Sequence, residues 1–406
     1  MDSLIKKGVI EKIEELADKK EKEIQENYYE KYHKFYDTAI KVLKRHNVLL
    51  YGGTAINELF PKKFKFYEEK ELPDIDIFCT DHFPISEDII KTFAKQGYTL
   101  TTVKEALHPD TYKIMIEGLQ LIDISVVSPP FFNVLKKNSR STSLGLPTVN
   151  IDYIKYSFHI ILSEPLNAFR WAKVYQRMVR FYEVFPIDTK CSFNIEKYYL
   201  DLPASVEQAI PRSIKKHKLL SFGWDVMSTY INEDETVKMA EKNKFTSALT
   251  EKKHVSPVRY TVINKDSDRI VKEIVKECGL VIDHVFPGDE VLPRYYCLAY
   301  NKERCLYVFE SPNCISYLTH KGKRILSIHS LLHYLYAMYL STQEKDIHCV
   351  IQLLTVLQIN NALSDKKLFQ QFILNCYGFQ KGLVTLRKER FLRMKNMWAY
   401  NITDAF

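Results

Sequence analysis

Hydrophobic residues follow two different periods along the first third of the chain. Over residues 4–46 they recur every three or four positions, which predicts one long helix. Its charged stretch, residues 18–26, is typical of a solvated helix face or of an arm that contacts another subunit. Short apolar runs at 48–51, 74–78 and 121–127 indicate buried strands.

The region between these runs predicts the rest of a small mixed sheet. Residues 86–96 are expected to form a helix with Ser86 as its N-cap. Residues 99–104 and 112–117 are expected to form antiparallel strands around a His-Pro-Asp turn. Helical spacing returns over residues 151–185. This order of elements indicates an α+β domain with a mixed α/β sheet.

The second half repeats the combination of helices and strands. Its expected strands are 280–286, 295–300 and 305–309, and its expected helices are 270–278, 327–340 and 347–360. We therefore expect an N-terminal helical segment (1–46), a catalytic domain with its following helix (47–190) and a C-terminal domain (191–406). The composition shifts near residue 190, which is where we place the boundary.

Composition is that of an ordinary globular protein. Hydrophobic residues make up 46% and charged residues 27% of the 406 positions, and the formal charge is +8, the sign expected of a protein that holds nucleic acid. The eight cysteines have no zinc-like spacing, so we expect buried thiols in a reducing compartment. We expect no secretory signal and no membrane span. His329 and His333 are expected to be packing residues rather than metal ligands.

Three acidic residues stand in the strand segments. Asp74 and Asp76 alternate with apolar residues and should share one face of their strand, and Asp123 lies within the apolar run 121–127. Two carboxylates ~4–5 Å apart repel by roughly 3–4 kcal/mol at an effective dielectric near ~20. A bound divalent cation, Mg²⁺ or Mn²⁺, would offset that repulsion, so we predict a metal site at Asp74, Asp76 and Asp123.

A glycine-rich turn precedes the first acidic pair. Gly52, Gly53 and Thr54 follow the strand 48–51 and should lead into a helix over residues 55–60. Unpaired amides at a helix N-terminus favour anions, and the hydroxyl of Thr54 is a further donor. This turn is therefore expected to hold the phosphates of a nucleotide.

The motif Gly52-Gly53-Thr54, Asp74-Ile75-Asp76 and the later single Asp123 resembles the nucleotidyltransferase superfamily of DNA polymerase β-like enzymes. Within it, the stretches 51–57 and 72–78 look closest to the poly(A) polymerase catalytic subunits of large cytoplasmic DNA viruses, of the poxvirus and giant-virus type. The gap from Gly53 to Asp74 is longer than is usual for the superfamily. The resemblance implies a polymerase β-like domain followed by an accessory domain or a degenerate nucleotidyltransferase copy, with Asn57 also near the nucleotide.

Basic residues supply further candidates. Lys173 and Arg177 lie four apart on a predicted helix, which in the related polymerases approaches the triphosphate; surface solubility is the alternative. RNA contacts are expected from Lys62, Lys63, Lys65, Lys136, Lys137, Arg140, Arg390 and Arg393. A solvated loop or helix face explains the later five equally well.

The resemblance implies a template-independent poly(A) polymerase that adds AMP from ATP to single-stranded RNA 3′ ends by a two-metal mechanism. Two alternatives stay open: an RNA-binding processivity scaffold with an inert fold, and a transferase of another nucleotide or acceptor, such as uridylyl, CCA-adding or oligoadenylate synthesis. The resemblance also implies a cytoplasmic location, in a virus factory or virion. The expected partner is a second copy of the chain in a homodimer, or a viral processivity subunit.

Overall fold

The computed structural model describes residues 7–187, 199–200, 202–233, 254–255, 260–311, 313–379 and 381–403. The chain forms two compact units: Met1–Ile151 together with Leu383–Phe406, and Asp152–Gly382. The predicted boundary near residue 190 lies outside the described residues. The division by contacts differs from the expected one, because the last helix belongs to the first unit and residues 152–187 belong to the second.

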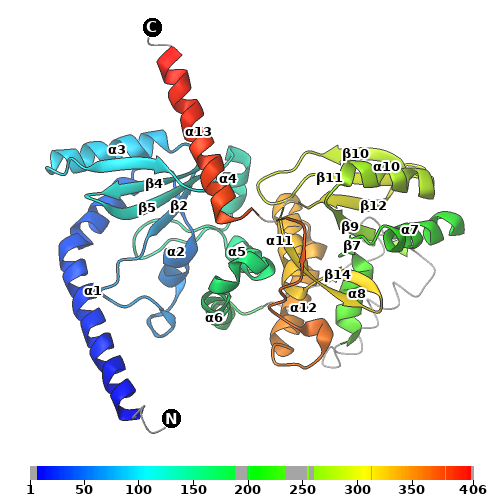
Figure 1. Cartoon of the computed structure of the whole chain (residues 1–406), viewed down its shortest axis with the longest axis horizontal. Coiled ribbons are helices and arrows are strands. Elements are labelled where there is room, and N and C mark those ends of the chain that lie inside the picture. The colour runs from blue at the N-terminus through cyan, green and yellow to red at the C-terminus, as the bar shows by residue number, and fades with distance from the viewer. Residues whose placement is uncertain are drawn as a thin grey trace. The chain divides into compact units, whose positions relative to one another are not determined.

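The first unit is built on a five-stranded sheet in the order β1-β2-β5-β4-β3 (Figure 1). β1 is antiparallel to β2, β2 is parallel to β5, and β5, β4 and β3 are antiparallel to one another. The strands are β1 (Leu49–Leu50), β2 (Ile75–Cys79), β3 (Thr101–Glu105), β4 (Thr111–Ile116) and β5 (Leu119–Val126). The predicted mixed sheet is therefore present.

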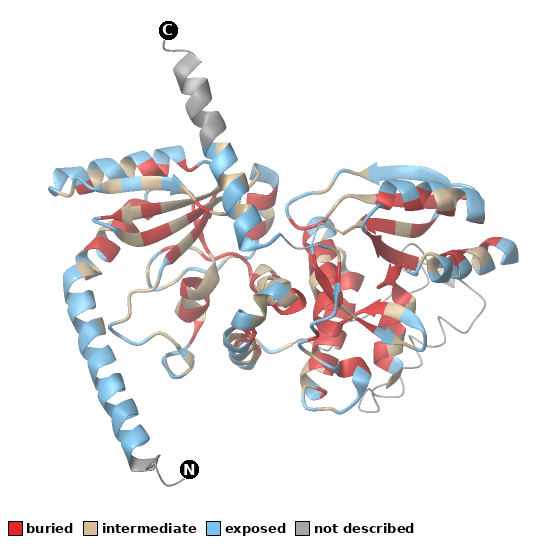
Figure 2. Cartoon of the chain, viewed as in Figure 1, coloured by how far each residue is buried: buried red, intermediate tan, exposed pale blue. Residues whose placement is uncertain are grey.

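Five α-helices are described in the first unit: α1 (Lys7–Leu43), α2 (Gly52–Leu59), α3 (Phe83–Lys95), α4 (Pro129–Lys136) and α13 (Leu383–Thr403). The N-terminal half of α1 is exposed, whereas its last turns are buried from Phe35 onward (Figure 2). Phe35 packs edge-on against Phe93 of α3, at 5.6 Å between ring centroids. The apolar periodicity predicted this helix correctly.

Two predicted helix starts differ from the structure. α3 begins at Phe83, so Ser86 lies inside the helix and is not its N-cap; Pro84 fits the first turn because its missing N–H needs no partner there. α2 begins at Gly52 rather than at residue 55. The Gly-Gly-Thr sequence is therefore the first turn of the helix and not a turn before it.

The second unit contains an eight-stranded sheet in the order β10-β11-β12-β9-β7-β14-β13-β15 (Figure 1). Its strands are β7 (Leu220–Ser221), β9 (Tyr260–Asn264), β10 (Val281–Phe286), β11 (Tyr295–Tyr300), β12 (Glu303–Glu310), β13 (Ile315–His320), β14 (Lys323–Leu326) and β15 (Cys376–Tyr377). A separate pair joins β6 (Tyr199–Leu200) to β8 (His254–Val255).

The α-helices described in the second unit are α5 (Ile151–Ser163), α6 (Ala168–Val184), α7 (Ala204–Lys216), α8 (Trp224–Glu233), α10 (Ser267–Cys278), α11 (Ile328–Thr342) and α12 (Lys345–Asn360). The single helix expected over residues 151–185 is thus two helices. The break falls at Pro165, which lacks the N–H needed to continue an α-helix and starts a short 3₁₀ turn.

Part of the second sheet repeats the first. β7 is antiparallel to β9, β9 is parallel to β12, and β12, β11 and β10 are antiparallel, which matches β1, β2, β5, β4 and β3 strand for strand. An equivalent hydrogen bond follows β1 and β7: the amide of Tyr51 donates to the carbonyl of Asp76, and that of Phe222 donates to the carbonyl of Thr261. The second unit therefore repeats the five-strand topology of the first.

The register identifies what replaces the acids in this repeat. Thr261 takes the place of Asp76, and its partner on the parallel neighbour is Tyr307, in the place of Asp123. A hydroxyl and a phenol provide no pair of charged oxygens for a divalent cation. These two positions of the repeat thus lack the acidic pair, as expected of a degenerate copy.

The cysteines depart from the expectation of free thiols. A disulfide joins Cys314 and Cys376, whose Cα atoms are 5.3 Å apart next to the β13–β15 pair. Cys79, Cys278, Cys297 and Cys305 are free and buried, as predicted. Sequence spacing held no sign of the bond because 62 residues separate its two cysteines.

Within the described part of the chain, no helix combines the length and the apolar character that crossing a bilayer requires.

Candidate active site

The register of β2 and β5 places two of the predicted acids opposite each other. Asp76 pairs with Asp123 across these parallel strands, so both side chains leave the same face of the sheet. Their neighbours on both sides, Ile75, Ile77, Ile122 and Ile124, are fully buried on the other face. Apolar burial on that face fixes the register, because a slip by one residue would turn the isoleucines outward.

Asp74 is exposed and directly precedes β2. The side-chain amide of Gln120 donates to Asp123 Oδ1 at 3.0 Å and makes a longer contact with Asp74 Oδ2 at 3.4 Å. Desolvation, followed by the charge of Asp123, raises the pKa of the Asp74 carboxyl, and Lys113 opposes that rise. Asp74 and Asp123 therefore repel each other, and this repulsion contributes to the raised pKa of Asp74.

Lys113 and Gln120, which the sequence interpretation missed, contact the side chains of the acidic residues. Lys113 of β4 lies opposite Asp123 in the antiparallel register, with its Nζ 3.3 Å from Asp123 Oδ2 and 2.8 Å from Gln120 Oε1. Gln120 in turn joins Asp123 to Asp74. Pairing the predicted strand 112–117 with the run 121–127 would have pointed to Lys113.

Gly52 is required where it stands. Its φ of +69° is a left-handed conformation, and a Cβ built on it would lie 2.3 Å from Asp76 Oδ2. Only glycine lets the first turn of α2 approach the carboxylate this closely. The amides of Gly52, Gly53 and Thr54, as the first of the helix, have no partner within α2. They are donors suited to an anion beside the acids.

The side chains of Thr54 and Asn57 have partners within the first unit, and their predicted contacts with a nucleotide stay predictions. The hydroxyl of Thr54 is buried and donates to the carbonyl of Asp74 at 2.7 Å, so it fixes the backbone of the first acid. The side-chain carbonyl of Asn57 accepts from the amides of Phe66 and Tyr67 at 2.9 and 3.2 Å. Both residues position the loop between α2 and β2, which is the long gap noted in the sequence.

The three lysines of the loop between α2 and β2 differ in whether they form an ion pair. Lys62 and Lys63 are exposed in a short 3₁₀ turn, and Lys63 lies over the ring of Phe64. Lys65 pairs with Glu58 of α2, with 3.3 Å between Nζ and Oε1. Lys62 and Lys63 are thus the more accessible of the three for a polyanion.

Lys136, Lys137 and Arg140 lie at the end of α4 and just after it, and all three are exposed. The Nζ of Lys136 donates to Asn47 Oδ1 at 2.9 Å. On α13, Arg393 donates to Glu105 at 2.6 Å and to the carbonyl of Leu107, which ties this helix to the end of β3. Arg393 therefore has a structural task in the first unit.

The remaining predicted residues belong to other elements of the fold. Arg390 is partly buried on α13. Lys173 and Arg177 lie on α6, which belongs to the second unit. Lys173 is exposed and Arg177 is partly buried. Their role with the triphosphate stays a prediction.

The donor chemistry of the acidic group, Asp74, Asp76 and Asp123, suits a divalent cation. Carboxylate oxygens are the ligands that Mg²⁺ and Mn²⁺ prefer. Across the residues that the structure describes, no three His, Cys, Asp or Glu side chains already converge as a ligand set. The bridge of Gln120 joins Asp74 and Asp123 instead. The residue types fit a cation.

The histidines behave as predicted. His329 and His333 lie inside the second unit with His159, whose Nδ1 is 3.2 Å from Nδ1 of His329. Burial lowers the pKa of His329 and His333 to about 4, and burial together with the two neighbouring histidines lowers the pKa of His159 as well. All three are neutral packing residues near pH 7.

Residues 38–168 match the family described as poly(A) polymerase catalytic subunit. This segment contains the whole acidic group, the glycine turn, Lys113 and Gln120. It leaves the repeated fold of the second unit outside the match.

Two viral proteins, both described as "Putative poly(A) polymerase catalytic subunit", are similar to part of this chain. The one from Acanthamoeba polyphaga mimivirus is 27% identical over 179 residues, which are 41% of this chain and 28% of the relative. The one from African swine fever virus (strain Badajoz 1971 Vero-adapted) is 25% identical over 168 residues, 40% of this chain and 33% of the relative. The matched region spans about a third or less of either relative.

The fold has a solved counterpart. The crystal structure of the Megavirus polyadenylate synthase superposes with a TM-score of 0.78 at 17% identity, over 96% of this chain and 84% of that one. At this identity the likeness concerns the fold, including its mixed α+β character. Taken with the family match and the two viral relatives, it confirms the similarity to viral poly(A) polymerase catalytic subunits that the glycine and aspartate motifs indicated.

Proposed function

We propose that this chain is a template-independent poly(A) polymerase that adds AMP from ATP to the 3′ end of RNA, and that the RNA is mRNA. The observation that carries the proposal is the register of Asp76 against Asp123, with Gly52 in close contact with Asp76. A chain that needed only a stable sheet would have no use for this arrangement, because paired carboxylates repel each other.

Each residue of the site has a task in this proposal. Asp74, Asp76 and Asp123 would hold one divalent cation, and Asp74 and Asp76 would hold a second. When bound, such cations lower the pKa of the RNA 3′-hydroxyl and stabilise the leaving pyrophosphate. The amides of Gly52 and Gly53 orient the β- and γ-phosphates. Thr54 keeps Asp74 in place through its carbonyl.

Lys113 and Gln120 add a means of keeping the acids ordered before substrate arrives. In the structure, Lys113 supplies the positive charge beside Asp123. We propose that it moves away from Asp123 when the metal and ATP bind, so that the carboxylate becomes a ligand. The ammonium group of Lys113 therefore compensates the repulsion between the acids in the free enzyme.

The basic residues of the first unit suit the RNA. Lys62, Lys63, Lys137 and Arg140 are exposed, and we propose that they contact phosphates. A second copy of the chain or a processivity subunit is the expected protein partner. Size-exclusion chromatography of the purified chain, alone and with RNA, distinguishes these two cases.

The decisive experiment measures AMP incorporation into an RNA primer by purified protein with ATP and Mg²⁺. Asp76→Asn and Asp123→Asn should each lower the rate on the order of 10³-fold or more, because several kcal/mol of charge stabilisation are lost. Tyr307→Phe, at the position of Asp123 in the second unit, is the matched control and should retain the wild-type rate.

Three outcomes contradict the proposal or refine it. Incorporation by Asp76→Asn at the wild-type rate would reject the mechanism. Wild-type protein that binds RNA without extending it would favour the inert scaffold. Extension with UTP or CTP in preference to ATP would retain the transferase and reject adenylate as its product.

A further inference from the structure

A cleft of about 760 Å³ lies in the second unit between α7 and the β13–β14 hairpin. The cations that line it are Arg212, Lys215, Lys218, Lys323 and Arg324, and Asp225 is the carboxylate in the lining. Its floor is apolar and includes Leu219 and Tyr260. Five positive charges against one negative charge make it a site for an anion.

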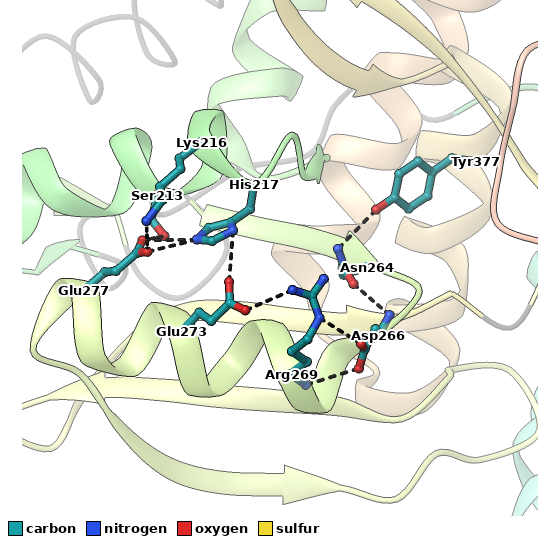
Figure 3. Close-up of polar contacts among 9 residues, drawn as sticks. All are labelled: Ser213, Lys216, His217, Asn264, Asp266, Arg269, Glu273, Glu277 and Tyr377. Carbon is teal, nitrogen blue, oxygen red and sulfur yellow. Dashed lines mark hydrogen bonds and ion pairs between the residues drawn. The ribbon is translucent and has the colours of Figure 1, made fainter.

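The orientation of α7 explains why cations face the cleft. Ser213, Lys216 and His217, at the end of α7, face α10 and bind its residue Glu277 (Figure 3). Their spacing of three and four residues puts them on one face. Arg212 and Lys215, three apart on the adjacent face, are thereby directed to the cleft.

A further salt-bridge chain keeps α10 itself in place. Glu273 pairs with Nδ1 of His217 at 3.2 Å and with Arg269 at 2.9 Å, and Arg269 pairs with Asp266 at the helix start (Figure 3). The wall of the cleft that carries Arg212 and Lys215 is therefore anchored to α10 from behind.

The wall formed by the β13–β14 hairpin carries the guanidinium of Arg324 and the ammonium group of Lys323. Arg324 donates to the carbonyl of Lys218 at 3.4 Å and lies over the ring of Tyr317. Lys323 is exposed, and its Nζ is 3.8 Å from Asp225. In the described part of the chain, the side chains of Lys215 and Lys218 make no hydrogen bond or ion pair, so their charges are available to a ligand.

The cleft is not a remnant of a second active site. Thr261 and Tyr307, which stand in the places of Asp76 and Asp123, are not among the described residues that line it. In the first unit, Lys44 precedes β1 as Lys215 precedes β7, and its side chain lies close to Gly145.

We propose that this cleft binds the phosphates of single-stranded RNA, as a second RNA site separate from the acidic group. The identity of the ligand rests on the proposed function, whereas the anion site rests on the lining alone. Cations from three separate segments suit successive phosphates of a strand, and the apolar floor suits sugar and base faces. Positively charged side chains dominate the lining, so phosphate contacts should supply most of the affinity and binding should depend little on base sequence.

Equilibrium binding of labelled oligoadenylate and oligouridylate, without ATP and with a metal chelator, tests the cleft. Lys215→Gln combined with Lys323→Gln should weaken binding of both probes by roughly tenfold at low salt, and the slope of log affinity against log salt should become shallower by about 1.4, at about 0.7 per lost contact. The control removes the same charge elsewhere in the second unit, with Lys276→Gln and Lys302→Gln, both outside the cleft.

The control pair should change neither the affinity nor the slope appreciably. Equal losses in the two pairs, or no loss in the cleft pair, would overturn the proposal. Lys215→Arg with Lys323→Arg keeps both charges and should restore binding. AMP incorporation by the wild-type chain is measured separately, so a failure of the polymerase proposal and a failure of the cleft proposal give different results.

Discussion

The two units carry the same five-strand arrangement with different chemistry. In the first, β2 and β5 present Asp76 and Asp123 as neighbours, and in the second, β9 and β12 present Thr261 and Tyr307 at the same positions. The same five-strand arrangement therefore accommodates an acidic pair in one unit and a buried threonine opposite a tyrosine in the other. At these two positions of a common scaffold, the candidate catalytic unit carries acids and its repeat does not.

The two units also resemble each other in the segments that lead into their sheets. Arg45 and His46 follow α1 and bind Asp88 of α3 at 3.1 and 3.0 Å. In the second unit, Lys216 and His217 hold the same places and bind Glu277 of α10. A basic residue and a histidine thus bind an acid on the neighbouring helix in both units, which points to a repeated structural device rather than to chemistry.

Gly52 approaches Asp76 closely in the acidic unit, and of the changes that leave the acids themselves in place, replacing Gly52 should have the largest effect on the rate. In Gly52→Ala the new Cβ would lie 2.3 Å from Asp76 Oδ2, so the carboxylate must move. A misplacement of about 1 Å can cost on the order of 10²-fold in rate. AMP incorporation by the variant should fall by at least that factor.

Gly97→Ala separates the clash from backbone strain. Gly97 also has a positive φ, of +85°, but nothing lies within 4 Å of the position that a Cβ would take there. Both variants should lose stability by about 1–3 kcal/mol through strain, measured by denaturant unfolding. Only Gly52→Ala should lose activity; equal rates in the two variants would reject the role of Gly52 in placing Asp76.

Much of the first unit could be predicted from its sequence because local periodicity determines it. The apolar alternation around Asp76 and Asp123 specified two strands with one buried face, and the isoleucines occupy that face. The long period of α1 was equally clear. Residues that follow a repeating pattern carry their own structural signal.

Contacts between distant segments were not predictable in the same way. Lys113 reaches Asp123 only through the β4–β5 register, and the hydroxyl of Thr54 reaches the carbonyl of Asp74 across the loop. The sequence does hold a signal for the repeat, since Lys44-Arg45-His46 before β1 resembles Lys215-Lys216-His217 before β7. Two short similar segments far apart are recognised only once both are known to lead into equivalent strands.

The buried histidines of the second unit predict an intermediate effect on stability. His329 and His333 have pKa values lowered to about 4 in the folded chain, against about 6.5 when unfolded. The folded state therefore binds fewer protons, and the free energy of unfolding falls as the pH drops from about 6.5 toward 4. Each histidine contributes up to roughly 3 kcal/mol to this loss.

Thermal unfolding between pH 7 and pH 4 measures this dependence. His329→Gln can keep the contact with Gln371 and removes one titrating group, so its melting temperature should depend less steeply on pH. Desolvation, followed by the charge of Asp123, raises the pKa of Asp74, so protonation of this group at lower pH stabilises the folded chain, which is the opposite of the histidine effect. Asp74→Asn should therefore leave the acid-induced loss in place, and a flat profile in the wild type would contradict the assignment.

The helix-end ion pairs should give the smallest effect, because they are solvent-screened. Glu277→Gln should lower hydrogen-exchange protection at the end of α7 by a small factor and leave the end of α1 unchanged, and Asp88→Asn should do the reverse. Contact with Lys216, the first of its partners, lowers the pKa of Glu277 to about 2. Its contribution is thus present above about pH 4.5 and is lost as the pH falls toward 2. If either variant lost hydrogen-exchange protection at both helix ends, the ion pairs of Asp88 and of Glu277 would not be independent. The two units would then unfold as one cooperative structure rather than as two.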